Sequence, residues 1–471
     1  MGDGEGTEST RERSWLRALW DGEIRVRSER HRRLADAYVV FFAITFAIGF
    51  LGLMHHTAYL GPGLGDDPSV RPFAQLWQAA GRVGPPLPFV DPLREGAASL
   101  AQLALVVLVV ANVAATAAII LGGYFRFERV FGQKYPQDQL WTFALLAALN
   151  SAAITVMLAG LAGLAALFGV DFVDGFFAFD RVLVFAREQA QELPTLVHLP
   201  PFLAFLLIYN VGGFFHYWAH RLGHESRVLW LLFHRHHHMN YDLTQPTSQP
   251  VFFAFPLFVV LAVPYVFAFA AVAKLFTDDP LAVASYTILF KLVAAFATTF
   301  SHQSALYDVA SRSRFVRVLG QLVSEGPYHY LHHSAEPAEH SRRGNVVNVG
   351  GGMVFLWDRV FGTFRDLTAR RPAVGLEGSP RLHLNPLRLA LSGVAQLGVE
   401  LANNRTPSAW LRILLGGADH RPTVSRDFAI RADRGSLRRG QTRDPIRRAG
   451  PCLPAAAATM RADRGRGSRP R

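Results

Sequence analysis

Histidine is concentrated in two short stretches of this 471-residue chain. Seven of its eighteen histidines lie within residues 216–238, and three more lie within residues 329–333. Neutral imidazole is the commonest metal-binding side chain in proteins. The single cysteine, Cys452, excludes a multi-cysteine zinc or iron–sulfur site. The two stretches therefore predict a metal centre whose ligands are mainly imidazoles.

The spacing of these histidines matches helical faces. His220 and His224 are four residues apart, so a helix places them on one face. In the next cluster His234 and His237 share a face, and the histidine that follows is rotated by about 100°. Residues 329–333 repeat the same His-x-x-His-His pattern. So many imidazoles exceed the four ligands of a tetrahedral zinc site and favour two metal ions.

Long apolar runs are the elements that must position these clusters. Half of the residues are apolar, and the mean hydropathy is +0.18. Each run is close to the ~20 residues that cross ~30 Å of hydrocarbon. We therefore expect an all-α integral membrane protein with about six transmembrane helices. The expected spans are 38–55, 100–123, 141–169, 199–216, 251–273 and 281–300.

The basic residues indicate how these spans are oriented. An arginine cluster within residues 25–33 precedes the first span and places the N-terminus in the cytoplasm by the positive-inside rule. Two spans separate the two histidine stretches, so both stretches are expected on the cytoplasmic face, together with His302 and the C-terminus. The topology and the histidine spacing therefore agree on one helical, histidine-rich di-metal site at that face.

The basic end of the chain accounts for most of the net charge. Residues 421–471 hold fourteen arginines and four aspartates, and so carry +10 of the net charge of +12. Phe428 is the only aromatic residue in this segment, which argues against binding to nucleic acid. We expect a solvated, disordered tail beside an anionic membrane surface.

The residues around the clusters carry a more specific pattern. Tyr217-Trp218-Ala219-His220-Arg221 surrounds the first cluster, Leu229-Trp230 precedes the second, and Trp357-Asp358-Arg359-Val360-Phe361-Gly362-Thr363-Phe364 follows the third. Together these residues resemble the fatty acid hydroxylase/sterol desaturase superfamily over residues 200–366. Their context looks most like the branch that contains alkylglycerol monooxygenase and bacterial sterol desaturases.

This resemblance implies a set of metal ligands around two iron ions, a site that zinc can also occupy in a purified or crystalline form. The implied ligands are His220, His224, His234, His237, His238, His302, His329, His332 and His333. Further candidates, as extra ligands or as residues that orient ligands, are His216, His236, Glu225, Asp242 and Asp358. For Asp358, an ion pair with Arg359 or Arg221 is the alternative.

The chain departs from the family pattern at two places. Gly213 stands where many members carry an aspartate, seven residues before the first ligand, so that carboxylate is missing. Residues 240–249 contain no arginine, although members often carry one after the second cluster. A substrate inferred from close relatives therefore does not transfer directly.

The resemblance implies an O2-dependent hydroxylase of a sterol-like, ether-lipid or fatty-acyl substrate. The sequence shows no flavin, haem or iron–sulfur motif, so the electrons are expected from a cytochrome b5-like carrier or from a ferredoxin with its reductase. One alternative is a lipid or sterol desaturase that uses the same site. A second is a non-catalytic metal-binding or transport protein, which the nearly charge-free spans disfavour.

The expected domain organisation has five parts. They are a cytoplasmic polar leader (1–36), N-terminal transmembrane helices (37–195), a catalytic domain (196–366), a trailing segment (367–420) and the basic tail (421–471).

Overall fold

The computed structural model describes a helical protein. It describes residues 28–59, 100–132, 134–167, 192–238, 270–335, 346–368, 370–374 and 385–425, together with residues 19, 20, 22, 24 and 268. Asp242 and residues 426–471, on which two predictions rest, lie outside the described residues. The described residues form helices and two isolated β-bridges but no strand, so the all-α prediction is confirmed for this part of the chain.

Five helices coincide with predicted spans. They are α2 (Glu29–Tyr59), α4 (Leu100–Phe131), α5 (Gln137–Leu167), α7 (Pro201–Glu225) and α11 (Pro280–Thr299). Within the described residues, Val110–Phe131 and Pro201–Glu225 are long and apolar enough to cross a membrane. The predicted span 251–273 falls mostly outside the described residues. The six-span topology therefore stays a prediction.

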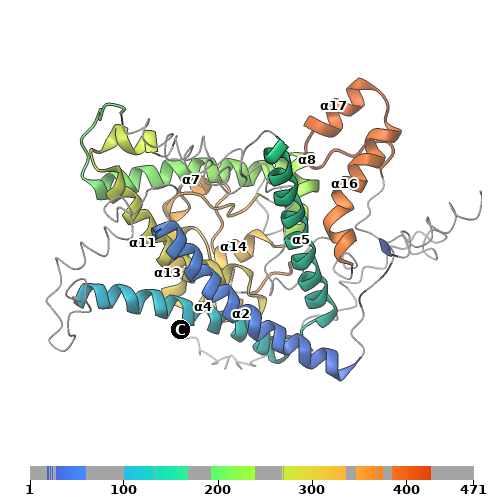
Figure 1. The fold of residues 1–471 in the computed structure, drawn as a ribbon, viewed down its shortest axis with the longest axis horizontal. Coiled ribbons are helices and arrows are strands. Elements are labelled where there is room, and N and C mark those ends of the chain that lie inside the picture. The colour runs from blue at the N-terminus through green and yellow to red at the C-terminus, as the bar shows by residue number, and fades with distance from the viewer. Residues whose placement is uncertain are drawn as a thin grey trace, which may run out of the picture. The chain divides into compact units, whose positions relative to one another are not determined.

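The long helices pack through small and aromatic side chains. α2 packs along α4, and α11 packs against both α4 and α7 (Figure 1). Between α7 and α11, the ring of Phe205 lies 5.9 Å from the ring of Phe290, tilted by 57°, in a cluster that also buries Ala204 and Val283. The hydroxyl of Tyr124 in α4 donates to a carboxylate oxygen of Asp36 in α2 at 2.6 Å. The contacts between α7 and α11 hold together the two helices that lead into the histidine clusters.

Helix α7 is longer than the predicted span 199–216. It begins after Pro200, with Pro201 in its first turn, and continues to Glu225. His216, His220 and His224 therefore lie on one continuous helix. At Ser226 the backbone becomes extended, and a short helical segment, a π-helical turn η2 (Trp230–His234) and α9 (Arg235–His238) follow. Such π-turns occur frequently at functional sites.

The third cluster lies on a short helix between two tight turns. Helix α13 (Arg314–Val323) ends where Ser324 takes a positive φ of 57°. Gly326, with a φ of 71°, then starts α14 (Pro327–His332). A loop over residues 346–352 leads into α15 (Leu356–Val360).

Two further helices cover η2 from outside. α16 (Pro386–Asn403) approaches η2 so closely that a Cβ on Gly393 would lie 2.0 Å from the carbonyl oxygen of Leu231. This glycine is therefore needed where the two backbones meet. α17 (Pro407–Leu415) packs on α8 (Arg227–Leu229), which directly precedes η2.

Candidate metal centre

Nine histidines from four segments converge in two groups. Within each group the ligand nitrogens all lie within 4.8 Å of one another. The five-histidine group consists of His220, His224, His234, His238 and His332. The four-histidine group consists of His237, His302, His329 and His333. The structure thus brings together all nine histidines that the sequence analysis named as ligands.

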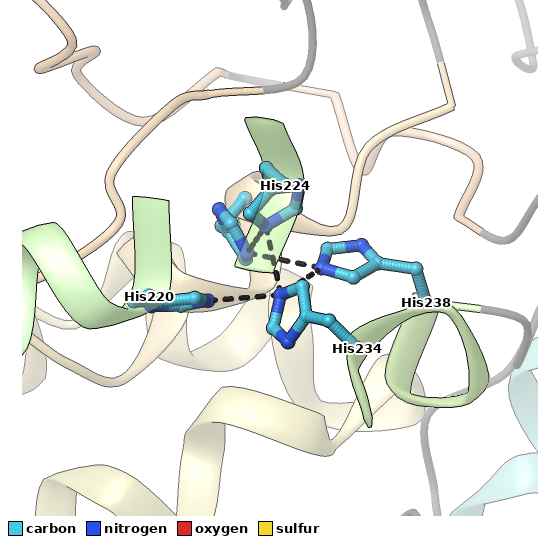
Figure 2. Close-up of side chains that lie close together, drawn as sticks. His220, His224, His234 and His238 are labelled. Atoms are coloured by element: carbon cyan, nitrogen blue, oxygen red, sulfur yellow. Dashed lines mark hydrogen bonds between the residues drawn. The ribbon is translucent and has the colours of Figure 1, made fainter. Parts of the chain in front are cut away.

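The five-histidine group is built around His234 of η2. The Nε2 atom of His234 lies 2.8 Å from Nε2 of His224 and 3.2 Å from Nε2 of His220 (Figure 2). Nε2 of His238 is 3.1 Å from that of His234, and Nε2 of His332 is 3.1 Å from those of His224 and His238. Five Nε2 atoms therefore face a common point.

The four-histidine group joins the end of α11 to α14. Nε2 of His333 lies 3.2 Å from Nε2 of His302 and 3.2 Å from Nε2 of His329. The ring of His237 completes the group, with its centroid 4.3 Å from that of His333 and 4.9 Å from that of His302. His302 belongs to this group although it stands alone in the sequence, because it ends the short 3-10 turn that closes α11.

The two His-x-x-His-His clusters are sorted by four-residue spacing rather than by three-residue spacing. His234 and His238 enter the five-histidine group, whereas His237 enters the four-histidine group. The third cluster has the opposite assignment, because His329 and His333 share the four-histidine group and His332 does not. His234 and His237, which were expected to share a helical face, therefore belong to different groups. Residues i and i+4 differ by about 40° around a helix, whereas i+3 lies about 100° from i+4.

Main-chain carbonyl groups orient two rings of the five-histidine group. Nδ1 of His220 lies 2.5 Å from the carbonyl oxygen of Val349, and Nδ1 of His332 lies 2.6 Å from that of Val347. A carbonyl oxygen only accepts hydrogen bonds, so Nδ1 of each ring carries the proton. The Nε2 lone pair of each ring is then available for a metal ion, which is the arrangement found in metal-ligating histidines. The donor set therefore fits a metal.

Asp358 holds the loop that carries these carbonyl groups. It is fully buried, and its carboxylate accepts hydrogen bonds from the backbone N–H groups of Val349 at 2.8 Å and Gly350 at 3.0 Å. The hydroxyl of Thr363 donates to it at 2.8 Å. Asp358 therefore acts on the histidines through the backbone of the loop, and not through their N–H groups. Arg359 instead donates to the carbonyl oxygen of Val354.

Glu325 lies beside the four-histidine group and was missed by the sequence analysis. Its Oε2 lies 3.9 Å from Nδ1 of His329, and the hydroxyl of Ser301 donates to the same oxygen at 3.0 Å. The sequence offered a signal, because Glu325 precedes His329 by four residues. That signal was weak, because the glycine and proline between the two residues do not continue a helix.

Burial keeps the imidazoles in their neutral form. It is the largest cause that lowers the pKa of the group histidines outside α7, and the neighbouring imidazoles lower most of these values further. Burial alone lowers the pKa of His302 to about 4. Burial has the opposite effect on the acids, and raises the pKa of Asp358 to about 6 and that of Glu325 to about 7. Neutral histidines are the form that binds metal.

The remaining candidates lie outside both groups. The ring of His216 is 6.0 Å from that of His220, one turn earlier on α7. His236 faces α16, where its Nε2 is 3.5 Å from the hydroxyl of Ser392. Glu225 forms an ion pair with Arg221 at 2.9 Å, and its side chain is 42% exposed.

The departure at Gly213 has a structural reason. A Cβ at this position would lie 2.0 Å from the backbone nitrogen of Gly352, so α7 and the glycine-rich loop are in direct backbone contact. The three glycines Gly350, Gly351 and Gly352 all have positive φ, which other residues rarely adopt. An aspartate at position 213 would therefore displace the loop whose carbonyl groups orient His220 and His332.

Comparison with known protein families places these residues in one matched segment of the chain. Residues 204–363 match the family model of the fatty acid hydroxylases. This matched segment contains all nine histidines of the two groups and the orienting loop. No solved structure matches the chain.

Proposed function

We propose that the protein is a membrane-bound oxygenase that hydroxylates a C–H bond of a lipid, because residues 204–363 match the family model of the fatty acid hydroxylases, an oxidoreductase family. The observation that carries the proposal is the sorting of nine imidazoles, six of them buried and three half-buried, into two adjoining groups. A dinuclear centre needs two such sets of nitrogen donors.

The five-histidine group would hold one metal ion and the four-histidine group the other. Imidazole accepts iron, copper, nickel or zinc, so the donor atoms alone do not select the metal. Iron is the ion we propose, because the family oxidises lipids and bound iron supplies O2 chemistry. The four-histidine group has one nitrogen fewer, which leaves more room there for a further ligand.

The reaction requires electrons from another protein. Insertion of one atom of O2 into a C–H bond reduces the other atom to water and consumes two electrons and two protons. The sequence shows no flavin, haem or iron–sulfur motif that would supply these electrons within the chain. We therefore propose a cytochrome b5-like carrier, or a ferredoxin with its reductase, as the donor.

The histidine groups lie at the ends of helices that the sequence predicts to cross the membrane. α7 carries His220 and His224 near its C-terminal end, and His302 directly follows α11. We propose that this end faces the cytoplasm, where a soluble electron carrier has access and where the lipid can enter from the bilayer. The substrate classes that remain are sterol-like, ether-lipid and fatty-acyl.

Desaturation is the second candidate. Removal of two hydrogen atoms from a lipid would use the same metal-binding histidines and the same supply of electrons. The two reactions differ in their products. Hydroxylation adds one oxygen atom to the lipid, whereas desaturation removes two hydrogen atoms and adds none.

The test compares lipid extracts from a host that expresses the protein with extracts from a host that expresses His332→Ala at the same level. With ¹⁸O2 in the gas phase, we expect a lipid that gains one labelled oxygen atom only with the unaltered protein. A product that lacks two hydrogen atoms and carries no label would favour desaturation. Identical extracts, or a product that persists in the variant, would contradict both reactions.

Purified protein provides the second measurement. We expect about two iron ions per chain, held by two groups of imidazoles. Metal far below that ratio, unchanged by His237→Ala or His332→Ala, would contradict the di-metal centre.

A further inference from the structure

Helix α17 exposes large apolar side chains although it lies outside the segment that matches the family. The α17 apolar face consists of Trp410, Leu411, Leu414 and Leu415, which are 46%, 58%, 42% and 80% exposed. Ile413 is the one fully buried side chain of the helix, and it packs against Leu231 and Leu397. The helix is therefore attached to the body of the protein by its other side.

The four exposed side chains form one continuous surface. Their spacing of i, i+1, i+4 and i+5 covers an arc of about 140° around a helix. Such an arc is the apolar face of an amphipathic helix, which in a soluble protein would be buried. The only polar group of the arc, the indole N–H of Trp410, already donates to the carbonyl oxygen of Leu401 at 3.0 Å. The face therefore offers no free hydrogen-bonding group to a partner.

The helix is fixed to the end of a candidate membrane span. The N–H of Arg227 donates to the carbonyl oxygen of Gly416 at 3.1 Å, and the N–H of Ala418 donates to that of Glu225 at 2.8 Å. The guanidinium of Arg227 also forms a buried ion pair with Glu400 of α16 at 2.5 Å. Glu225 is the last residue of α7, so α17 lies where α7 would leave the hydrocarbon.

The charges around the face are basic. Residues 401–425 contain Arg405, Arg412 and Arg421 against a single acidic residue, Asp419. All three arginines are exposed, and Arg412 lies within α17 next to the apolar face. An amphipathic helix of this kind, with leucine and tryptophan on one side and arginine beside them, lies in the interface of a membrane. Arginines close to an anionic surface strengthen such binding.

We propose that α17 is an interfacial anchor whose apolar face enters the bilayer leaflet at the C-terminal end of α7, and whose arginines contact anionic head groups. This proposal rests on the proposed membrane crossing of α7. Ile413 of α17 contacts Leu231 of η2, and η2 carries His234. The anchor would therefore set the depth of the histidine groups relative to the membrane surface, and with it the part of a lipid that reaches them.

The chain has a single cysteine, Cys452, so its replacement allows a spin label to be attached at one chosen position. In full-length Cys452→Ser protein, Leu415→Cys receives a spin label, and the protein is reconstituted into vesicles of phosphatidylcholine with or without phosphatidylserine. The matched control is Asn403→Cys, an exposed polar position at the end of α16. Collision rates are measured with O2, which concentrates in lipid, and with a nickel chelate, which stays in water.

We expect the label at position 415 to collide more with O2 and the label at 403 to collide more with nickel. Phosphatidylserine should increase this contrast, and Arg405→Glu with Arg412→Glu should reduce that increase. Equal nickel access at 415 and 403 would overturn the proposal. Protection at 415 that appears only at high protein-to-lipid ratio, or only with added electron carrier, would assign the face to a second copy or to a protein partner and would also overturn it.

The metal content of the same samples separates this proposal from the proposed function. About two metal ions per chain without the collision contrast would contradict the anchor alone. The contrast without bound metal would contradict the di-metal centre and leave the anchor in place.

Discussion

The two histidine groups differ in what orients their rings. In the five-histidine group, carbonyl oxygens of Val347 and Val349 orient two rings, and Asp358 holds the loop that carries them. In the four-histidine group, the carboxylate of Glu325 lies 3.9 Å from Nδ1 of His329. A carbonyl group keeps one charge state, whereas a carboxylate can gain a proton. Hydrogen bonds to main-chain carbonyl groups therefore orient two rings of the five-histidine group, whereas the 3.9 Å between Glu325 and His329 is longer than a hydrogen bond.

Removal of a ligand from either group should have the largest effect. We expect His224→Ala and His333→Ala each to lower the metal content from about two ions to about one, from different groups. Hydroxylation should fall at least about a thousandfold, or about 4 kcal/mol, because the metal supplies the chemistry. Metal analysis together with product mass checks both. If both variants lost the same ion, the division into two groups would be wrong.

Loss of Asp358 should affect the five-histidine group selectively. Removal of a residue that orients metal ligands typically costs about 10–100-fold in metal affinity. We expect Asp358→Ala to lower the affinity for one of the two metal ions by that factor. Asp358→Asn should lower this affinity less, because the amide oxygen still accepts a hydrogen bond from one N–H group. Titration with a competing chelator measures both affinities, with Asp366→Asn as the exposed control. An equal loss of affinity for both metal ions would show that Asp358 does not act on the five-histidine group alone.

Acid should destabilise the metal-free protein. Burial lowers the pKa of the group histidines outside α7, so below about pH 6.5 the unfolded chain binds more protons than the folded chain. The free energy of unfolding is therefore highest above pH 6.5 and falls as the pH decreases. His302, with a pKa of about 4, contributes about 1 kcal/mol of this loss at pH 5.5. A thermal melt between pH 7.5 and 5.5 checks the sign. A midpoint that rises on acidification would contradict it.

Glu325 should oppose this acid effect within the four-histidine group. Its pKa is raised to about 7, so the folded chain gains stability as the pH falls through that value. Glu325→Gln should therefore make the loss between pH 7.5 and 5.5 steeper, by on the order of 1 kcal/mol, because the side chain is 28% exposed and solvent screens part of the effect.

The same Glu325→Gln variant should lower the affinity of the four-histidine group for its metal ion by about tenfold. The affinity of the five-histidine group should stay unchanged. Chelator titration measures this difference. A parallel slope in the melts together with unchanged affinities would assign Glu325 no part in the site.

The smallest effect is expected at His216. Its ring lies outside both groups, so His216→Phe should leave two metal ions in place and lower turnover by less than about threefold. Metal analysis and product yield check this, with His220→Phe as the contrasting variant. Loss of an ion in His216→Phe would make His216 a tenth ligand.

Several features were predictable from the sequence because they depend on local spacing and residue type. The histidine clusters indicated metal, the lack of cysteine pairs excluded thiolate sites, and the apolar runs indicated long helices. Four-residue spacing placed His220 with His224 on α7, since one helix decides that relation. The residues around Asp358 pointed to the family, and residues 204–363 match it.

Only the tertiary structure decided how the ligands are shared and held. The direction of each short helix determines whether the middle histidine of a cluster enters one group or the other, and α9 and α14 make opposite choices. The carbonyl groups of Val347 and Val349 carry no side-chain signature, and Glu325 lies in a turn without helical periodicity. From the sequence, Gly213 indicated only a missing carboxylate. In the structure it is the point where the backbone of α7 contacts the loop of residues 346–352. Spacing along one helix is a local property, but contact between distant segments depends on how the whole chain packs.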